Sequence, residues 1–131
     1  MFTWYDCLDN NKFLITLYNS VPMLGEVQIT KLAISDSGNR ITIAFKMPFY
    51  PESPPKKWKE RNYNSAMLEL DFFAISMLNI NANTNYYIGN IEIKRTENQL
   101  IDITISGNIN VQFQAESGLI QSVEGYILRS E

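Results

Sequence analysis

The sequence contains no histidine. This absence removes the usual general base, the Ser-His and Cys-His nucleophile pairs, and the commonest zinc ligand in proteins. Any catalysis by this chain would have to use carboxylates, lysine or tyrosine. We therefore expect no catalytic residues, no bound metal and no cofactor.

Cysteine and long apolar runs are also scarce. Cys7 is the single cysteine, so the chain has no internal disulfide and no multi-cysteine metal site, which suits a reducing compartment. No stretch approaches the roughly 18 apolar residues of a membrane span. The first residues carry Asp6 and Asp9 before any base, unlike a secretory signal. These features predict a cytoplasmic protein without a membrane partner.

Charge and glycine usage argue against nucleic acids and nucleotides. The net charge is -3 and the pI is about 5.0, so no basic field covers the molecule to attract a phosphate backbone. The six glycines are scattered, and none pair into a phosphate-binding loop. Gly38, Gly107 and Gly118 fall between alternating runs, which is typical of turns.

The composition present is that of a globular protein. Of the 131 residues, 45% are hydrophobic and 12% aromatic, which is far from the polar make-up of disordered chains. A chain of this length buries enough surface to fold without disulfides or metals. We expect one domain over residues 1–131.

Periodicity predicts a mainly β (α+β) protein with a short N-terminal helical segment. Apolar spacings of three and four favour a helix from Thr3 to Tyr18, interrupted at Asn10-Asn11. From Glu26 the period becomes two, with turn residues between the runs, which favours an antiparallel sandwich or open barrel of seven to eight strands. The clearest runs cover residues 27–34, 41–47, 66–74, 86–95, 100–106, 109–115 and 119–128. The asparagine-rich residues 79–85 are expected to form a loop, and the isoleucines from Ile91 to Ile109 to lie in the core.

Two carboxylate pairs are the only candidates for acid–base chemistry. Glu69 and Asp71 are two apart on an expected strand and so share a face, and Asp6 and Asp9 lie close together on an expected helix. No third residue type points to either pair. A solvated strand face and a solvated helix start are the favoured interpretation, and an enzyme is the least favoured function.

Residues 48–63 hold four of the five prolines and four of the eleven basic residues. A proline-stiffened loop carrying Lys57, Trp58, Arg61 and Tyr63 would make a good protein anchor, because aromatic and arginine side chains dominate interface energy. These four residues are our partner-binding candidates. The competing interpretation is that Trp58 folds back over one end of the sheet, and we favour this structural role.

Several motifs in order resemble the immunity protein 50 family, the inhibitor side of bacterial polymorphic toxin systems. They are Trp4-Tyr5, Phe13-Leu14 with Leu17-Tyr18, Pro54-Pro55-Lys56-Lys57-Trp58, Asn62-Tyr63-Asn64, Leu68-Glu69-Leu70 with Phe72-Phe73, Ile120-Gln121-Ser122-Val123, and Tyr126-Ile127-Leu128. The resemblance implies a cytoplasmic protein that binds and neutralises one cognate toxin domain without catalysis. It supplies no settled set of toxin contacts. The alternative is a carbohydrate- or small-ligand-binding β module, with Trp58, Tyr63, Tyr86 and Tyr87 lining a groove.

Overall fold

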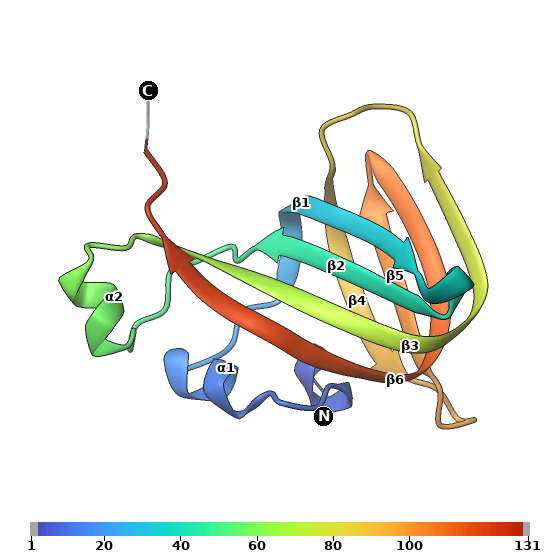
Figure 1. Cartoon of the computed structure of the whole chain (residues 1–131), viewed down its shortest axis with the longest axis horizontal. Helices are drawn as coiled ribbons and strands as arrows, with labels where there is room; N and C mark the ends of the chain where they lie inside the picture. The colour runs from blue at the N-terminus through green and yellow to red at the C-terminus, as the bar shows by residue number, and fades with distance from the viewer. Residues whose placement is uncertain (1–2, 130–131) are drawn as a thin grey trace.

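The computed structural model describes residues 3–129, and its main feature is an antiparallel sheet of six strands with a few short helices (Figure 1). The helical elements are η1 (Trp4–Cys7), α1 (Lys12–Leu17), η2 (Asp36–Gly38) and α2 (Lys56–Glu60). The strands are β1 (Leu24–Ser35), β2 (Arg40–Lys46), β3 (Ser65–Ala82), β4 (Ile88–Arg95), β5 (Ile101–Gly107) and β6 (Ile109–Tyr126). The prediction of a mainly β protein is confirmed.

The sheet closes on itself, in the order β1-β2-β3-β6-β5-β4. Closure depends on β1, whose first half pairs with β4 and whose second half pairs with β2. The change of partner lies between an irregularity at Leu24–Val27 and a bulge at Ile29–Lys31. Bulges bend a strand and increase its twist. The expected sandwich or open barrel is therefore replaced by a closed sheet.

The described residues 3–129 form six strands, and the prediction of seven to eight was wrong because Ser117-Gly118 is not a turn. Strand β6 runs straight through Gly118, which pairs with Phe72 of β3. A Cβ atom at Gly118 would lie 2.8 Å from the Phe72 ring and 3.0 Å from Leu8. The glycine thus permits close packing inside a strand, which is the other common reason for glycine there.

Strand β3 also extends beyond its predicted end. Residues Asn79–Ala82, expected in a loop, pair with Ile109–Gln112 of β6. Ala74 and Met77 adopt positive φ angles, and the register shifts between Ser76 and Asn79. These bulges break the alternation of side chains, so the sequence pattern does not reveal that the strand continues.

The N-terminal helical segment packs against the sheet. The interruption at Asn10-Asn11 is confirmed, since η1 and α1 are separate and Asn10 has a φ of 61°. The backbone N–H of Thr3 donates to the Asp6 carboxylate, and the Trp4 indole N–H donates to the carbonyl of Pro22. Leu8, Leu14 and Leu17 enter the core of the protein.

One hydrophobic core fills the closed sheet and the space under the N-terminal segment. The predicted burial of the isoleucines is confirmed, because the side chains of β4, β5 and early β6 alternate between buried and exposed. The buried members of this set are Ile91, Ile93, Ile101, Ile103, Ile105 and Ile109. Among residues 3–129, no helix has the length and apolar character needed to cross a membrane.

Candidate functional site

The proline-rich segment contains a helix that the sequence analysis did not predict. Pro55 occupies the N-cap position with an extended backbone, and its carbonyl accepts from the N–H groups of Trp58 and Lys59. At the other end Asn62 adopts a φ of 57°, Asn62 N–H donates to Lys59, and Tyr63 N–H donates to Trp58. This paired arrangement with a left-handed residue is a Schellman motif, which terminates α2. Helix therefore also occurs outside the N-terminal segment predicted from the sequence.

Trp58 lies inside this end of the molecule. Its side chain is only 8% exposed and contacts the rings of Phe13, Tyr50 and Tyr63 at centroid distances of 6.2 to 6.4 Å. Gly125 of β6 lies directly beneath, and a Cβ atom there would be 2.7 Å from Trp58 and 2.5 Å from Tyr63. Trp58 and Tyr63 therefore pack α2 against the end of the sheet, and for Trp58 this agrees with the expected structural role.

The loop leading into α2 is fixed by hydrogen bonds to the residues after α1. The hydroxyl of Tyr18 donates to the carbonyl of Phe49, Ser53 N–H donates to Leu17, and Asn19 N–H donates to the Glu52 carboxylate. Burial, and then the nearby Glu52 charge, raise the pKa of Tyr18, so its hydroxyl keeps its proton for this bond. Hydrogen bonds within the chain itself therefore hold the loop before α2 in position.

Lys57 and Arg61, the two charged candidates, remain on the surface. Both residues are exposed, and one guanidinium nitrogen of Arg61 donates to the Tyr63 hydroxyl at 3.2 Å. Lys59 is exposed as well, whereas Lys56 lies 3.8 Å from Glu60 one helical turn away. Figure 1 places α2 beyond the paired ends of β3 and β6. The four candidates thus lie together at one end of the sheet, which we call the α2 end. Trp58 and Tyr63 pack there, whereas Lys57 and Arg61 are exposed.

The aromatic groove of the alternative function does not form. Trp58 and Tyr63 lie at the α2 end, whereas Tyr86 and Tyr87 lie at the loop between β3 and β4, at the opposite end of the sheet (Figure 1). The carbonyls of these two residues bind neighbouring segments. Tyr87 accepts from the backbone N–H of Ile29 in β1, and Tyr86 accepts from the side-chain amide of Asn108 between β5 and β6. The structure therefore gives no support for a shared sugar-binding groove.

The carboxylates of β3 share one face, as expected, but each is paired with a base. Asp71 is completely buried, and its carboxylate lies 2.7 Å from the Arg40 guanidinium and accepts from the Thr42 hydroxyl. The hydrogen bond from Arg40 to Asp71, and then the negative charge of Asp71, raise the pKa of Arg40. Glu69 lies 3.4 Å from Lys31. Arg40 and Thr42 carry no signal of this role in the sequence, because only the register of β2 against β3 places them beside Asp71.

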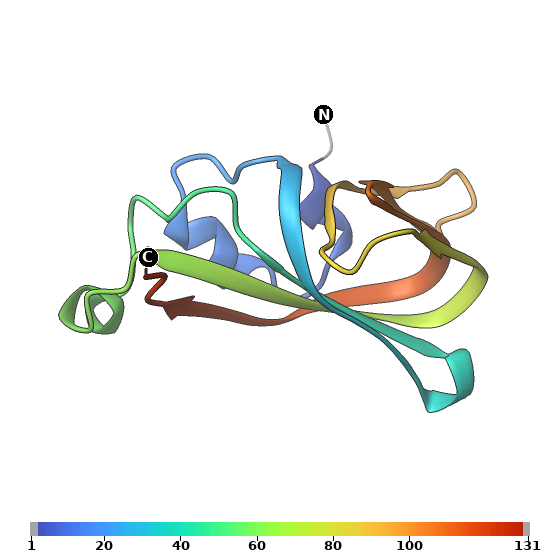
Figure 2. The same ribbon diagram turned by 90° about the horizontal axis from the view of Figure 1, so that it is seen from above.

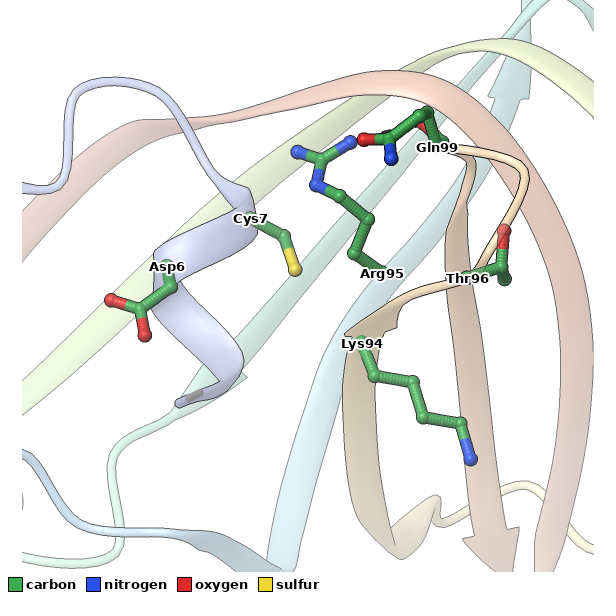
Figure 3. Close-up of a pocket in the computed structure, with 6 residues that line it drawn as sticks. All are labelled: Asp6, Cys7, Lys94, Arg95, Thr96 and Gln99. Carbon is green, nitrogen blue, oxygen red and sulfur yellow. Dashed lines mark hydrogen bonds between the residues drawn. The ribbon is translucent and has the colours of Figure 1, made fainter. Parts of the chain in front are cut away.

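A hollow beside the N-terminal segment is a poor catalytic site. It has a volume of about 520 Å³ and lies between η1 and the β4–β5 turn (Figure 3). The sulfur of Cys7 faces this hollow, and burial raises the pKa of the thiol, which disfavours the reactive thiolate. The Asp6 carboxylate accepts from the backbone N–H of Thr3, and the backbone of Asp9 bonds to Gly118 and Ile120 of β6. Within residues 3–129, no three potential ligands among His, Cys, Asp and Glu come together to hold a metal ion.

Comparison with known proteins identifies the family. The fold is similar to a crystal structure of an uncharacterized protein from Neisseria gonorrhoeae, with a TM-score of 0.50 and 14% identity, covering 75% of this chain and 92% of that chain. At this identity the similarity concerns the fold alone. No curated protein matches the chain. The family model for Immunity protein 50 matches residues 10–126. The chain belongs to this family.

Proposed function

We propose that this member of the immunity protein 50 family binds one cognate toxin of a bacterial polymorphic toxin system and neutralises it. The match over residues 10–126 is the observation that carries the proposal, because it spans most of the chain and both strands that reach α2. The family name implies a protein toxin as partner. Inhibition is by stoichiometric binding in the cytoplasm of the cell that makes the protein.

The action requires no catalysis by this chain. Histidine is absent, and the buried carboxylate of Asp71 is neutralised by Arg40. Glu69, the other carboxylate on this face, lies beside Lys31. A carboxylate whose oxygens already contact a cation is poorly placed to act as a general base, because these oxygens are engaged in that contact. These contacts support a binding protein.

The α2 end is the candidate contact surface for the toxin. Lys57 and Arg61 project from it, and the exposed rings of Phe13 and Phe49 lie on the elements that pack and pin α2. Exposed aromatic and arginine side chains on a rigid support are effective interface anchors, because little conformational entropy is lost on binding. The buried side chain of Trp58 supports this surface by positioning α2 on the sheet.

Co-expression tests this function. The partner is the C-terminal domain of the large secreted protein encoded beside the gene for this chain, expressed under a repressible promoter. We expect the chain to restore growth and to co-purify with that domain in equal amounts. A toxin domain from an unrelated system serves as the control and should still kill. Failure to restore growth together with failure to form a complex would refute the proposal.

A further inference from the structure

The distal half of β3 has a strand on one side only. Strand β2 pairs with β3 as far as Phe73, and Ala74 N–H donates to Asn39 in the β1–β2 turn. Beyond that point, within residues 3–129, β3 pairs only with β6. Figure 2 shows the β1–β2 hairpin turning away from this part of β3. Residues 75–82 therefore present an open edge of the sheet.

The open edge lacks the charged residues and prolines that commonly prevent another strand from pairing. Natural sheets guard such edges with charged residues, above all lysine, or with proline. No charged residue and no proline occurs from Phe72 to Ile91, and none from Ile103 to Ala115, which includes most of the paired stretch of β6. Apolar side chains are instead exposed along the edge, at Met77, Leu78 and Ile80. An uncharged apolar edge of this kind is a site where another strand is expected to pair.

Backbone irregularity limits where a strand can add. Met77 has a φ of 57°, and the register of β3 against β6 shifts between Ser76 and Asn79. After the shift the pairing is regular from Asn79 to Ala82. The bulge bends the first part of the edge. Only a short regular stretch around Ile80 therefore remains on which another strand can pair.

A second copy of the chain is better suited to pair with this stretch of β3 than a charged partner is. In a two-fold interface, residues near the axis face the same residues of the other copy, so any charge there would meet its own kind. Each copy has a net charge of -3, and the two copies repel one another wherever charged surfaces meet. An antiparallel pair centred on Ile80 places Ile80 against Ile80, and Asn79 against Asn81, without any like-charge contact.

We propose that two copies of the chain associate through their open edges, antiparallel, with the two-fold axis at Ile80. The pairing joins the two sheets and covers the exposed side chains of Met77, Leu78 and Ile80. It leaves both α2 ends at the far sides of the dimer. The inference is independent of the proposed toxin binding, since its test uses the purified chain alone.

Analytical ultracentrifugation of the full chain over a wide concentration range tests the association. We expect a monomer–dimer equilibrium whose dissociation constant rises at least about tenfold in Met77→Lys/Ile80→Lys, because like charges then face each other across the axis. The matched control is Met23→Lys/Ile34→Lys, which adds the same charge. Met23 and Ile34 are 85% and 50% exposed, against 78% and 39% for Met77 and Ile80, and lie on other segments. The control should dimerise like the parent.

Cross-linking tests the register without depending on the stability of the lysine variants. In a Cys7→Ser background, Ile80→Cys should form an inter-chain disulfide under mild oxidation, since facing Cα atoms in such a pair lie about 4.5 to 5.5 Å apart. Ile34→Cys in the same background should not. A parent that stays monomeric at all concentrations, or a dimer that survives Met77→Lys/Ile80→Lys, would overturn the proposal. A dimer that does not cross-link at Ile80→Cys would overturn the register.

Discussion

The two ends of the sheet are formed by the same two strands, but one end is covered by other segments and the other is not. Strands β3 and β6 pair from Ser65 and Tyr126 at the α2 end to Ala82 and Ile109 at the open edge. At the α2 end, Trp58 and the pinned proline-rich loop cover the strands, and the exposed charges are mainly basic. At the open edge no helix covers the strand, and no charge is present. The α2 end is therefore suited to a charged partner, and the open edge to an uncharged strand.

The sharpest test of this difference is aromatic truncation at each end. Trp58→Ala should lower the free energy of unfolding by about 3 to 5 kcal/mol, because it empties the packing site between α2 and Gly125. Tyr86→Ala is the control, since Tyr86 is 55% exposed at the opposite end, and it should cost no more than about 0.5 kcal/mol. Thermal and urea unfolding measure both. Toxin neutralisation by Trp58→Ala should persist at a permissive temperature; a parent-like melting curve with lost binding would make Trp58 a direct anchor.

Adding a methyl group beneath α2 should also destabilise the protein. Gly125→Ala places a Cβ atom within 2.5 Å of Tyr63 and 2.7 Å of Trp58, so these rings must shift, at a cost of about 1 to 3 kcal/mol. Gly25→Ala is the matched control, because its nearest neighbour would lie 3.5 Å away. Denaturant midpoints compare the two variants. Equal midpoints would show that α2 rests only loosely on the sheet.

Charge reversal separates binding from folding at the α2 end. Lys57→Glu/Arg61→Glu should slow association with an acidic toxin surface by about tenfold, because exposed charges act mainly on the association rate. Stability should change by no more than about 0.5 kcal/mol. Lys94→Glu/Arg95→Glu, on β4, makes the same charge change elsewhere and is the control. Surface plasmon resonance gives the rates, and equal rates for the two variants would exclude α2 from the interface.

The smallest expected effect is that of salt on dimerisation through the open edge. Dimerisation through uncharged residues has no ion pairs to screen, so its dissociation constant should change by less than about twofold between low and high salt. Toxin binding at the α2 end should weaken over the same range. A dimer that dissociates in high salt would show that charged residues outside the open edge hold it together.

Much of the local structure followed from the sequence. Period-two alternation predicted the strands and their buried faces, including Ile103 and Ile105, because a side chain's face depends only on its position along the strand. Asn10 was correctly predicted to interrupt the N-terminal helix, and the preferred packing role of Trp58 agrees with its burial. The missing histidines already made a histidine-based active site impossible.

The tertiary structure decided everything that depends on residues distant in the chain. Gly118 has the same neighbours in sequence as a turn glycine, and only the Phe72 ring and Leu8 show that it serves close packing in a strand. Asp71 and Arg40 become a buried pair through the register of β2 and β3, and β1 closes the sheet by changing partners at a bulge. Local periodicity specifies which face a residue takes but not what covers that face. Long-range packing alone determined that α2 covers one end of the sheet and leaves the edge of β3 open.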